Sequence, residues 1–304
     1  MVGIQYLPYQ QVDKKKWDGC IDRAGNGLVY AYSFYLDNMA HCWDALVLND
    51  YEIVMPLTWK KKYGIMYLYQ PFCTAALGLF GNDINGEMVK EFLKVIPAKF
   101  KYWDIYLNYE NVYSLNAFKL YKRTNYILPL NAPYEKLFAA FSTNLKRNIK
   151  KAAKLECCVS YDINVQDVVT LAKKQGKDYS NAGEKDYRHL QTLYQHLHAQ
   201  GKATCYGVYS ASGELLASCV WFFSHRRAYY ILAGNHPAGK TAGASHALIN
   251  QFIKDNAGED ILLDFEGSDV PTLASFYRSF GASVEIYGGL KLNKLPGVLK
   301  LFKQ

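Results

Sequence analysis

The sequence lacks the patterns that would place it in a membrane or hold a metal ion. No apolar run approaches the roughly 18 residues that cross a bilayer. Residues 1–16 lack the apolar core of a signal peptide. The seven cysteines contain no C-x-x-C pair, and the seven histidines offer no ligand spacing, which argues against a disulfide framework or a zinc site. We therefore expect a soluble, cytoplasmic protein with reduced thiols and no metal.

Tyrosine and positive charge are abundant instead. The 304 residues, half of them hydrophobic, are enough for two ordinary domains, each with its own core. Aromatic residues make up 15%, with 26 tyrosines, which indicates tyrosine-rich strands and cores or, alternatively, an aromatic cleft for a sugar or peptide. The net charge of +8 favours an anionic partner such as nucleotide phosphates, RNA or a membrane surface, without choosing among them.

Strands and helices alternate along the first part of the chain. Residues 43–48 and 52–57 predict two strands joined by a tight turn, which is a hairpin signal. Apolar residues at helical spacing predict a helix over 87–96. Tyrosines and branched residues predict further strands over 63–69, 101–109 and 118–130.

A helix start at Asn131-Ala132-Pro133 marks the predicted domain boundary. Asn is a favoured capping residue and Pro is favoured in the first turn of a helix. The helix that follows has one apolar stripe, formed by Leu137, Phe141, Leu145, Ile149 and Ala153. We therefore predict one domain over 1–130 and a second over 131–304, although the strand end at 126–130 is also compatible with the second sheet.

The second half repeats the mixed pattern. Helices are predicted over 165–174, 185–200, 242–256 and 271–280, and strands over 156–163, 204–209, 215–223, 228–233, 261–265 and 283–292. Antiparallel hairpins mixed with helices indicate an α/β fold with mixed sheets, in three layers, α/β/α.

The segment from 228 to 256 carries the clearest chemical signal. A strand runs into Gly234, and a glycine-bearing turn with Gly239, Lys240 and Gly243 then precedes a helix. Free amides at a helix start, together with the helix dipole, form an anion site, and glycine permits close approach by a phosphate. The alternative is a plain connection between strand and helix.

This turn resembles the pyrophosphate loop of the GNAT acyltransferase superfamily, Q/R-x-x-G-x-G/A. The run Lys240-Thr241-Ala242-Gly243-Ala244-Ser245 has the same spacing, with Lys at the first position and Ser at the last. The resemblance implies that acetyl-CoA or another acyl-CoA binds as co-substrate at Gly239, Lys240, Gly243, Ala244 and Ser245. It also implies that Tyr277, four residues before Gly281, is the general acid that protonates the leaving thiolate.

A narrower resemblance is to tandem-domain members, the bacterial Fem-type peptidoglycan aminoacyltransferases. It rests on the basic helix 144–152, on Asp264-Phe265-Glu266-Gly267-Ser268, and on 31–36 and 69–72 in the first half. It implies two tandem GNAT-like domains, of which the first is a degenerate copy without a pyrophosphate loop. Aminoacyl-tRNA is the donor that this resemblance implies as an alternative, bound through Lys146, Arg147, Lys150 and Lys151.

Acylation of an amine also needs a group that accepts the proton of the amine. Asp264 and Glu266 stand at a strand end, where one of them is predicted to be that base; the alternatives are helix capping or a salt bridge. His236 and His246 flank the glycine-bearing turn. The basic run around residue 150 is either a solvated helix face or a binding surface for phosphates.

These patterns predict an N-acyltransferase that moves an acyl group from acyl-CoA to an amine bound between the two domains. The acceptor class is a small-molecule, peptide or cell-wall precursor amine. Two alternatives stay open: a Fem-type transferase that uses aminoacyl-tRNA to extend cell-wall precursors, and a non-catalytic protein of the same fold that binds a peptide or glycan.

Overall fold

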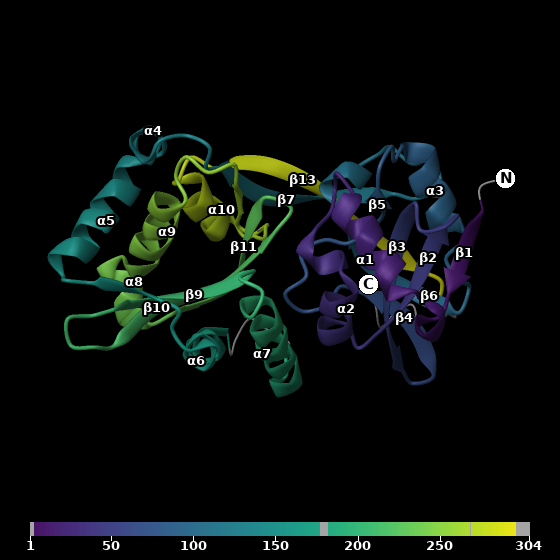
Figure 1. Ribbon diagram of the computed structural model, residues 1–304, viewed down its shortest axis with the longest axis horizontal. Helices are drawn as coiled ribbons and strands as arrows, with labels where there is room; N and C mark the ends of the chain where they lie inside the picture. Colours follow the sequence, from purple (N-terminus) through teal and green to yellow (C-terminus); the bar gives the residue numbers. More distant parts are fainter. Residues whose placement is uncertain (1–2, 177–181, 268, 296–304) are drawn as a thin grey trace. The chain divides into compact units, whose positions relative to one another are not determined.

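A computed structural model describes residues 3–176, 182–267 and 269–295 (Figure 1). The chain divides into two compact units, Met1–Thr124 with Ile286–Gln304 (unit 1) and Asn125–Glu285 (unit 2). The predicted boundary between 130 and 131 therefore lies a few residues inside unit 2, and the end of the chain groups with unit 1. In the described part of the chain, no helix is both long and apolar enough to cross a membrane.

Unit 1 is built on a mixed sheet with the strand order β1-β2-β3-β4-β6-β13. Its strands are β1 (Ile4–Leu7), β2 (Cys42–Leu48), β3 (Ile53–Lys62), β4 (Ile65–Tyr69), β6 (Phe100–Leu107) and part of β13 (Ser283–Asn293), with the short β5 (Phe80–Gly81) paired to β3. Its helices are α1 (Lys14–Arg23), α2 (Ser33–Met39) and α3 (Gly86–Lys94), with the 3-10 turns η1 (Tyr9–Gln11), η2 (Val29–Ala31) and η3 (Tyr109–Asn111).

The local predictions for unit 1 are confirmed. The β2–β3 hairpin pairs Leu48 with Ile53, and its turn places Asn49 and Tyr51 at positive φ. The predicted helix over 87–96 is α3, whose capping residue Asn85 accepts a hydrogen bond from the Met88 amide at 3.0 Å. The apolar face of α3 is buried against the sheet and forms the core of the unit.

Unit 2 has the strand order β7-β12-β11-β10-β9-β8. Its strands are β7 (Leu120–Pro129), β8 (Cys158–Tyr161), β9 (Ala203–Tyr209), β10 (Leu215–Ser224), β11 (Arg227–Asn235) and β12 (Leu262–Asp264). The pairs from β8 to β11 are antiparallel, and β12 is parallel to β11 and antiparallel to β7. The end of β7 thus belongs to the second sheet, where Leu128 pairs with Leu263.

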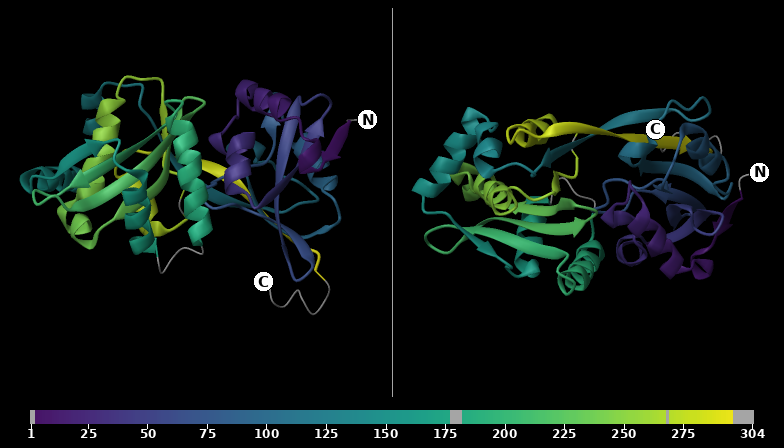
Figure 2. Two further views of the ribbon diagram at one scale, coloured as in Figure 1. Left: turned by 60° about the horizontal axis from the view of Figure 1, so that its bottom comes forward. Right: turned by 45° about the horizontal axis from the view of Figure 1, so that its top comes forward.

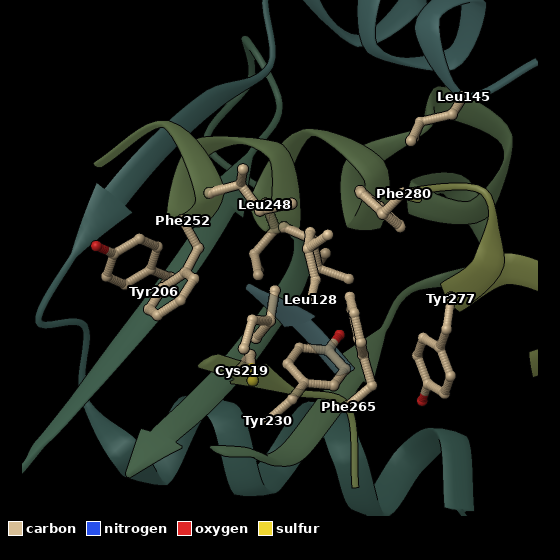
Figure 3. Packing of buried hydrophobic residues seen from close by; sticks show 14 of the residues in the cluster. Leu128, Leu145, Tyr206, Cys219, Tyr230, Leu248, Phe252, Phe265, Tyr277 and Phe280 are labelled. Atoms are coloured by element: carbon tan, nitrogen blue, oxygen red, sulfur yellow. The ribbon is translucent and has the colours of Figure 1, made fainter. Parts of the chain in front are cut away.

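Helices cover both faces of the unit 2 sheet, which confirms the three-layer arrangement. Its helices are α4 (Tyr134–Ala139), α5 (Thr143–Lys154), α6 (Val165–Gly176), α7 (Glu184–His198), α8 (Pro237–Ala242), α9 (Ala244–Asp255) and α10 (Pro271–Arg278). Figures 1 and 2 show α6 and α7 on one face and α9, backed by α5, on the other. Trp221 of the sheet stacks on Phe252 of α9 with ring centroids 3.8 Å apart. Figure 3 shows Phe252 beside Tyr206 in this core.

Two elements differ from the sequence-based predictions. The single helix expected after Pro133 is broken into α4 and α5, because Ser142 caps a new helix and its hydroxyl accepts a hydrogen bond from the Leu145 amide at 3.2 Å. The final strand β13 was expected in the second domain, but its residues from Gly288 to Asn293 pair with β6 of unit 1. Hydrophobic periodicity identifies a strand but carries no information about which sheet it joins.

Candidate active site

A cavity of about 410 Å³ lies within unit 2 at the end of β11. Its walls come from β11, α6, α8, α9 and α10, and are formed by Gln175, Tyr230, Ala233, Asn235, Gly239, Lys240, Ser245, His246, Leu273, Phe276 and Tyr277. Four predicted site residues, Gly239, Lys240, Ser245 and Tyr277, therefore meet here. The other four predicted site residues are not among the described residues that line the cavity; they are Gly243, Ala244, Asp264 and Glu266.

The two glycines of the turn are needed for packing within the protein. A Cβ atom on Gly239 would lie 2.1 Å from the carbonyl oxygen of Leu216 in β10. Gly243 has a φ of 82°, and a Cβ atom there would lie 2.7 Å from the carbonyl oxygen of Asn148 in α5. These contacts give both glycines a structural reason that differs from close approach by a phosphate.

Gly243 also separates two helices where the sequence predicted one. Its amide donates to the Gly239 carbonyl at 3.0 Å and ends α8 in the left-handed conformation, as glycine often does. The helix α9 begins at the next residue and runs for 12 residues. The predicted turn of Gly239 to Ser245 is therefore mostly a short helix, followed by the start of a longer one.

Three consecutive free amides lie at the start of α9, and the Lys240 amide is not one of the free amides. The first amides of any helix have no acceptor within it, and the helix dipole makes that end positive. The Lys240 amide already donates to the His236 carbonyl at 3.1 Å. Among the residues that the structure describes, no acceptor takes the amides of Ala244, Ser245 or His246. These three amides are available as anion donors.

A polar cluster that the sequence did not predict lies beside these amides. The Ser245 hydroxyl donates to the side-chain oxygen of Asn235, and the Asn235 amide donates to the side-chain oxygen of Gln175 at 2.7 Å. The Ser245 hydroxyl is thus engaged with a neighbour. Gln175 follows two lysines at the end of a helix and Asn235 ends a strand, so neither carries a sequence signal of its own.

Two buried tyrosines form one wall of the cavity. Tyr277 stacks on Phe265 with ring centroids 4.7 Å apart, and its hydroxyl points away from Phe280 (Figure 3). Burial raises the pKa of Tyr277 well above its usual value, with smaller contributions from the charges of Cys219 and Glu266. Burial also raises the pKa of Tyr230. Both phenols are therefore protonated at neutral pH.

His246 contributes a neutral imidazole to the same cavity. Burial lowers its pKa below the usual 6.5, so the ring is uncharged at pH 7. Its Nδ1 atom is buried and has no hydrogen-bond partner in the described residues, while Nε2 lies 3.5 Å from the side-chain amide nitrogen of Asn148. The ring meets Phe276 edge-on at 5.0 Å. An unpartnered ring nitrogen beside a protonated phenol can take part in proton transfer.

Residues 139–270, which span most of unit 2, match the family described as Acetyltransferase (GNAT) domain. The C-terminal part of this chain is a GNAT domain. Comparison with curated proteins gave no match. The matched residues end just before α10, so they include His246 and the α9 amides but not Tyr277.

Solved structures extend the likeness of fold to nearly the whole chain. A structure titled as FemX is 12% identical over 99% of this chain and 100% of its own, with a TM-score of 0.65. A conserved protein from Bacteroides thetaiotaomicron is 12% identical over 95% of this chain and 99% of its own, with a TM-score of 0.61. L-PGS from Bacillus licheniformis is 13% identical over 95% and 94%, with a TM-score of 0.57. The chain therefore has the tandem GNAT-like fold predicted from the sequence.

Asp264 lies outside the cavity of the GNAT domain, in a buried ion network. Arg227 donates to its carboxylate at 2.7 Å, the Asn125 side chain donates at 2.9 Å, and the Glu266 amide donates at 2.9 Å. Glu285 pairs with the same arginine at 2.6 Å. This geometry corresponds to the salt bridge, one of the alternatives that the sequence offered for Asp264. Both carboxylate oxygens already accept hydrogen bonds.

The basic helix α5 presents cations along the outer side of the GNAT domain. Arg147, Lys150, Lys151 and Lys154 are exposed, and no acidic side chain among the described residues pairs with them. Lys146 instead donates to the Ala139 carbonyl at 2.9 Å and lies 5.5 Å from the ring of Phe138. The helix packs on α8 and α9 through Asn148, so its charges border the segment that carries the free amides.

Proposed function

We propose that the GNAT domain transfers an acyl group from an acyl-coenzyme A thioester to an amine. One observation carries this proposal: a single cavity brings together the protonated Tyr277, the neutral His246 and the start of α9. A GNAT family match over 139–270 supports the same class of reaction. The acceptor remains a prediction, as a small-molecule, peptide or cell-wall precursor amine.

The start of α9 is the proposed seat of the coenzyme A diphosphate. The amides of Ala244, Ser245 and His246 open a 12-residue helix, and a helix N-terminus attracts anions through its amides and its dipole. Lys240 is exposed on the cavity wall and adds a positive charge. Gly239 and Gly243 contribute indirectly, because they let α8 turn and pack so that α9 begins at this point.

The cavity supplies both proton transfers that the reaction needs. The amine nitrogen attacks the thioester carbon, a C–N bond forms and the C–S bond breaks. We assign His246 as the group that accepts the proton of the amine, because its neutral ring has an unpartnered nitrogen. We assign Tyr277 as the donor to the thiolate sulfur, which leaves a phenolate that regains a proton from His246 through solvent. Asp264 is not proposed as the base. The role of Glu266 as the base stays a prediction, and Glu266 does not line the cavity.

The donor is tested by calorimetry with acetyl-CoA and with longer acyl-CoA thioesters. Reversing the charge at the cavity with Lys240→Glu is expected to weaken binding about tenfold, or about 1.4 kcal/mol. Lys202→Glu is the matched control, since Lys202 is an exposed cation of the same unit outside the cavity. No binding by the native protein would remove acyl-CoA as the donor, and equal affinity in both variants would place the diphosphate away from Lys240. Gly243→Glu is unsuitable here, since any Cβ at that position collides with α5.

Aminoacyl-tRNA is the second candidate donor, favoured by the exposed cations of α5. Lysines and arginines without acidic partners are suited to phosphate backbones, and their binding weakens steeply with salt. Salt-dependent binding of tRNA that falls in the Lys150→Glu, Lys151→Glu double variant, but not in Lys202→Glu, would support this donor. Binding of neither acyl-CoA nor tRNA would favour the third reading, a non-catalytic protein of the same fold.

A further inference from the structure

Unit 1 contains a second cavity, of about 550 Å³, which the proposed acyl transfer does not use. We call it the aromatic cavity and define it by Tyr6, Tyr9, Asp44, Trp43, Trp59 and Lys99. It lies where β1 ends at Leu7 and β2 begins at Cys42, so part of β2 has no paired strand on this side. Its volume falls in the range of about 300–1,000 Å³ that is typical of small-molecule sites.

The aromatic walls of this cavity are held in place from behind. Tyr9 meets Trp43 edge-on with ring centroids 5.6 Å apart, and Trp17 supports Trp43 from the core at 5.1 Å. Trp59 packs against Phe100 at 6.3 Å. Rings fixed in this way offer apolar faces without a large loss of side-chain entropy on binding.

The charged groups of the aromatic cavity are already paired within unit 1. The Asp44 carboxylate accepts hydrogen bonds from the Tyr6 hydroxyl at 2.5 Å and the Tyr9 amide at 3.1 Å, and Lys99 lies 3.4 Å away. Asp37 accepts from the Trp43 indole at 3.1 Å and pairs with Lys14 at 2.7 Å. Each carboxylate of the cavity wall therefore has a lysine partner, which disfavours a strongly charged ligand.

Two aromatic rings of the cavity, those of Tyr6 and Tyr9, already contact the protein's own lysines. Lys99 lies 4.7 Å from the centroid of the Tyr6 ring, and Lys14 lies 4.7 Å from that of Tyr9. An ammonium group would need these aromatic faces for a cation–π contact. A quaternary amine or a lysine side chain is thus a poor occupant.

One polar group of the cavity is left without a partner. The Trp59 indole nitrogen is buried and forms no hydrogen bond with any residue that the structure describes. A buried N–H without an acceptor costs about 1–3 kcal/mol, and a ligand oxygen would relieve this cost. The cavity therefore needs an acceptor oxygen on a neutral ligand that can also stack on aromatic rings.

We propose that the aromatic cavity binds a neutral saccharide. A sugar ring presents C–H groups to aromatic faces and hydroxyl or carbonyl oxygens to donors, so it supplies both the stacking and the acceptor for Trp59. The paired carboxylates retain free lone pairs that accept from the sugar hydroxyls. This site shares no residue with the GNAT cavity and does not depend on the proposed acyl transfer.

The test uses the full chain and saturation-transfer NMR with glucose, N-acetylglucosamine and cellobiose, with choline and acetate as charged comparisons. At least one saccharide is expected to bind, and neither charged probe. Trp59→Phe keeps an aromatic ring but removes the N–H together with the pyrrole part of the indole, and is expected to weaken binding about five- to tenfold. Tyr63→Phe is the matched control, since Tyr63 is 91% exposed and lies outside the cavity.

Three results would overturn the proposal: no saccharide binds, choline binds in their place, or Trp59→Phe leaves saccharide affinity unchanged. Because Trp59 also packs on Phe100, Tyr9→Leu provides a second variant at an exposed wall residue, and it is expected to weaken binding without affecting the core. Tyr277→Phe should leave saccharide binding intact, so failure of the acyl-transfer proposal and failure of this one are distinguishable.

Discussion

The two units treat their buried carboxylates in opposite ways. In unit 1, Asp44 stands in a cavity wall, held by a tyrosine, a backbone amide and the partly exposed Lys99. In unit 2, Asp264 is sealed beneath Arg227, and the neighbouring cavity is lined by tyrosines and His246 in place of a carboxylate. The comparison teaches that a carboxylate at a strand end marks a buried charge but not a catalytic base. Its partners decide which role it has.

The largest expected effect is on the sealed network of unit 2. Arg227→Met removes the cation from between Asp264 and Glu285 and leaves two acidic groups without it in the interior. Breaking a buried pair in this way costs about 3–5 kcal/mol of the free energy of unfolding. Urea denaturation followed by circular dichroism measures the loss.

The adjacent Arg226 is the control for this experiment. It pairs with Asp260, and both side chains are about three-quarters exposed. Arg226→Met is therefore expected to change the free energy of unfolding by no more than about 1 kcal/mol. Similar losses in the free energy of unfolding of the two variants would show that Asp264 does not depend on a buried cation. The contrast between the carboxylates of the two units would then be wrong.

The next effect concerns proton donation by Tyr277. Tyr277→Phe is expected to lower kcat about 100-fold, or about 2.7 kcal/mol, because a positioned general acid contributes roughly this much. Binding of acyl-CoA and the free energy of unfolding should change little, since only a hydroxyl is lost. Tyr230→Phe removes a second buried hydroxyl from the same cavity and is the matched comparison. An undiminished kcat in Tyr277→Phe would exclude it as the acid.

The pH dependence of the reaction sharpens the role of His246. A base must be deprotonated to work, and burial lowers the pKa of His246 below 6.5. Activity should therefore hold through neutral pH and fall only as the pH drops through that lowered pKa. In His246→Gln, the remaining activity should be at most about one tenth of the native activity. The fall in activity at acidic pH should be absent from the pH profile of this variant. A fall that persists in the variant would assign the titration to another group.

The sequence predicts much of the fold and only part of the site. Local signals such as the Asn85 cap and the β2–β3 turn are encoded in neighbouring residues and are confirmed. The partner of β13 depends on tertiary contacts and was not predicted. The break at Ser142 is marked by a local cap, which the prediction of one continuous helix from the apolar stripe missed. The glycines of the turn were predicted to permit close approach by a phosphate, and their packing against Leu216 and Asn148 could not be read from spacing.

The site residues show the same limit. The resemblance to GNAT motifs implied roles for Tyr277, Lys240 and Ser245, and the structure brings these three into one cavity. Gln175 and Asn235 come from separate elements with no pattern of their own. For Asp264, the sequence left a base and a salt bridge open. The structure places Arg227 and Asn125 around its carboxylate, which corresponds to the salt bridge.

The smallest expected effect tests how Asp44 is held in unit 1. Tyr6→Phe removes the hydroxyl that donates to Asp44, and is expected to cost about 1–2 kcal/mol of the free energy of unfolding, since the carboxylate keeps the Tyr9 amide and Lys99. Lys99→Met should cost less, about 1 kcal/mol at most, because Lys99 is 39% exposed and 3.4 Å away. Urea denaturation followed by tryptophan fluorescence suits both variants, as four of the five tryptophans belong to unit 1. If Lys99→Met proved the more damaging, Asp44 would depend on its cation as Asp264 depends on Arg227. The aromatic cavity would then contain an ion pair next to open space, and the proposal that it binds a neutral ligand would be weakened.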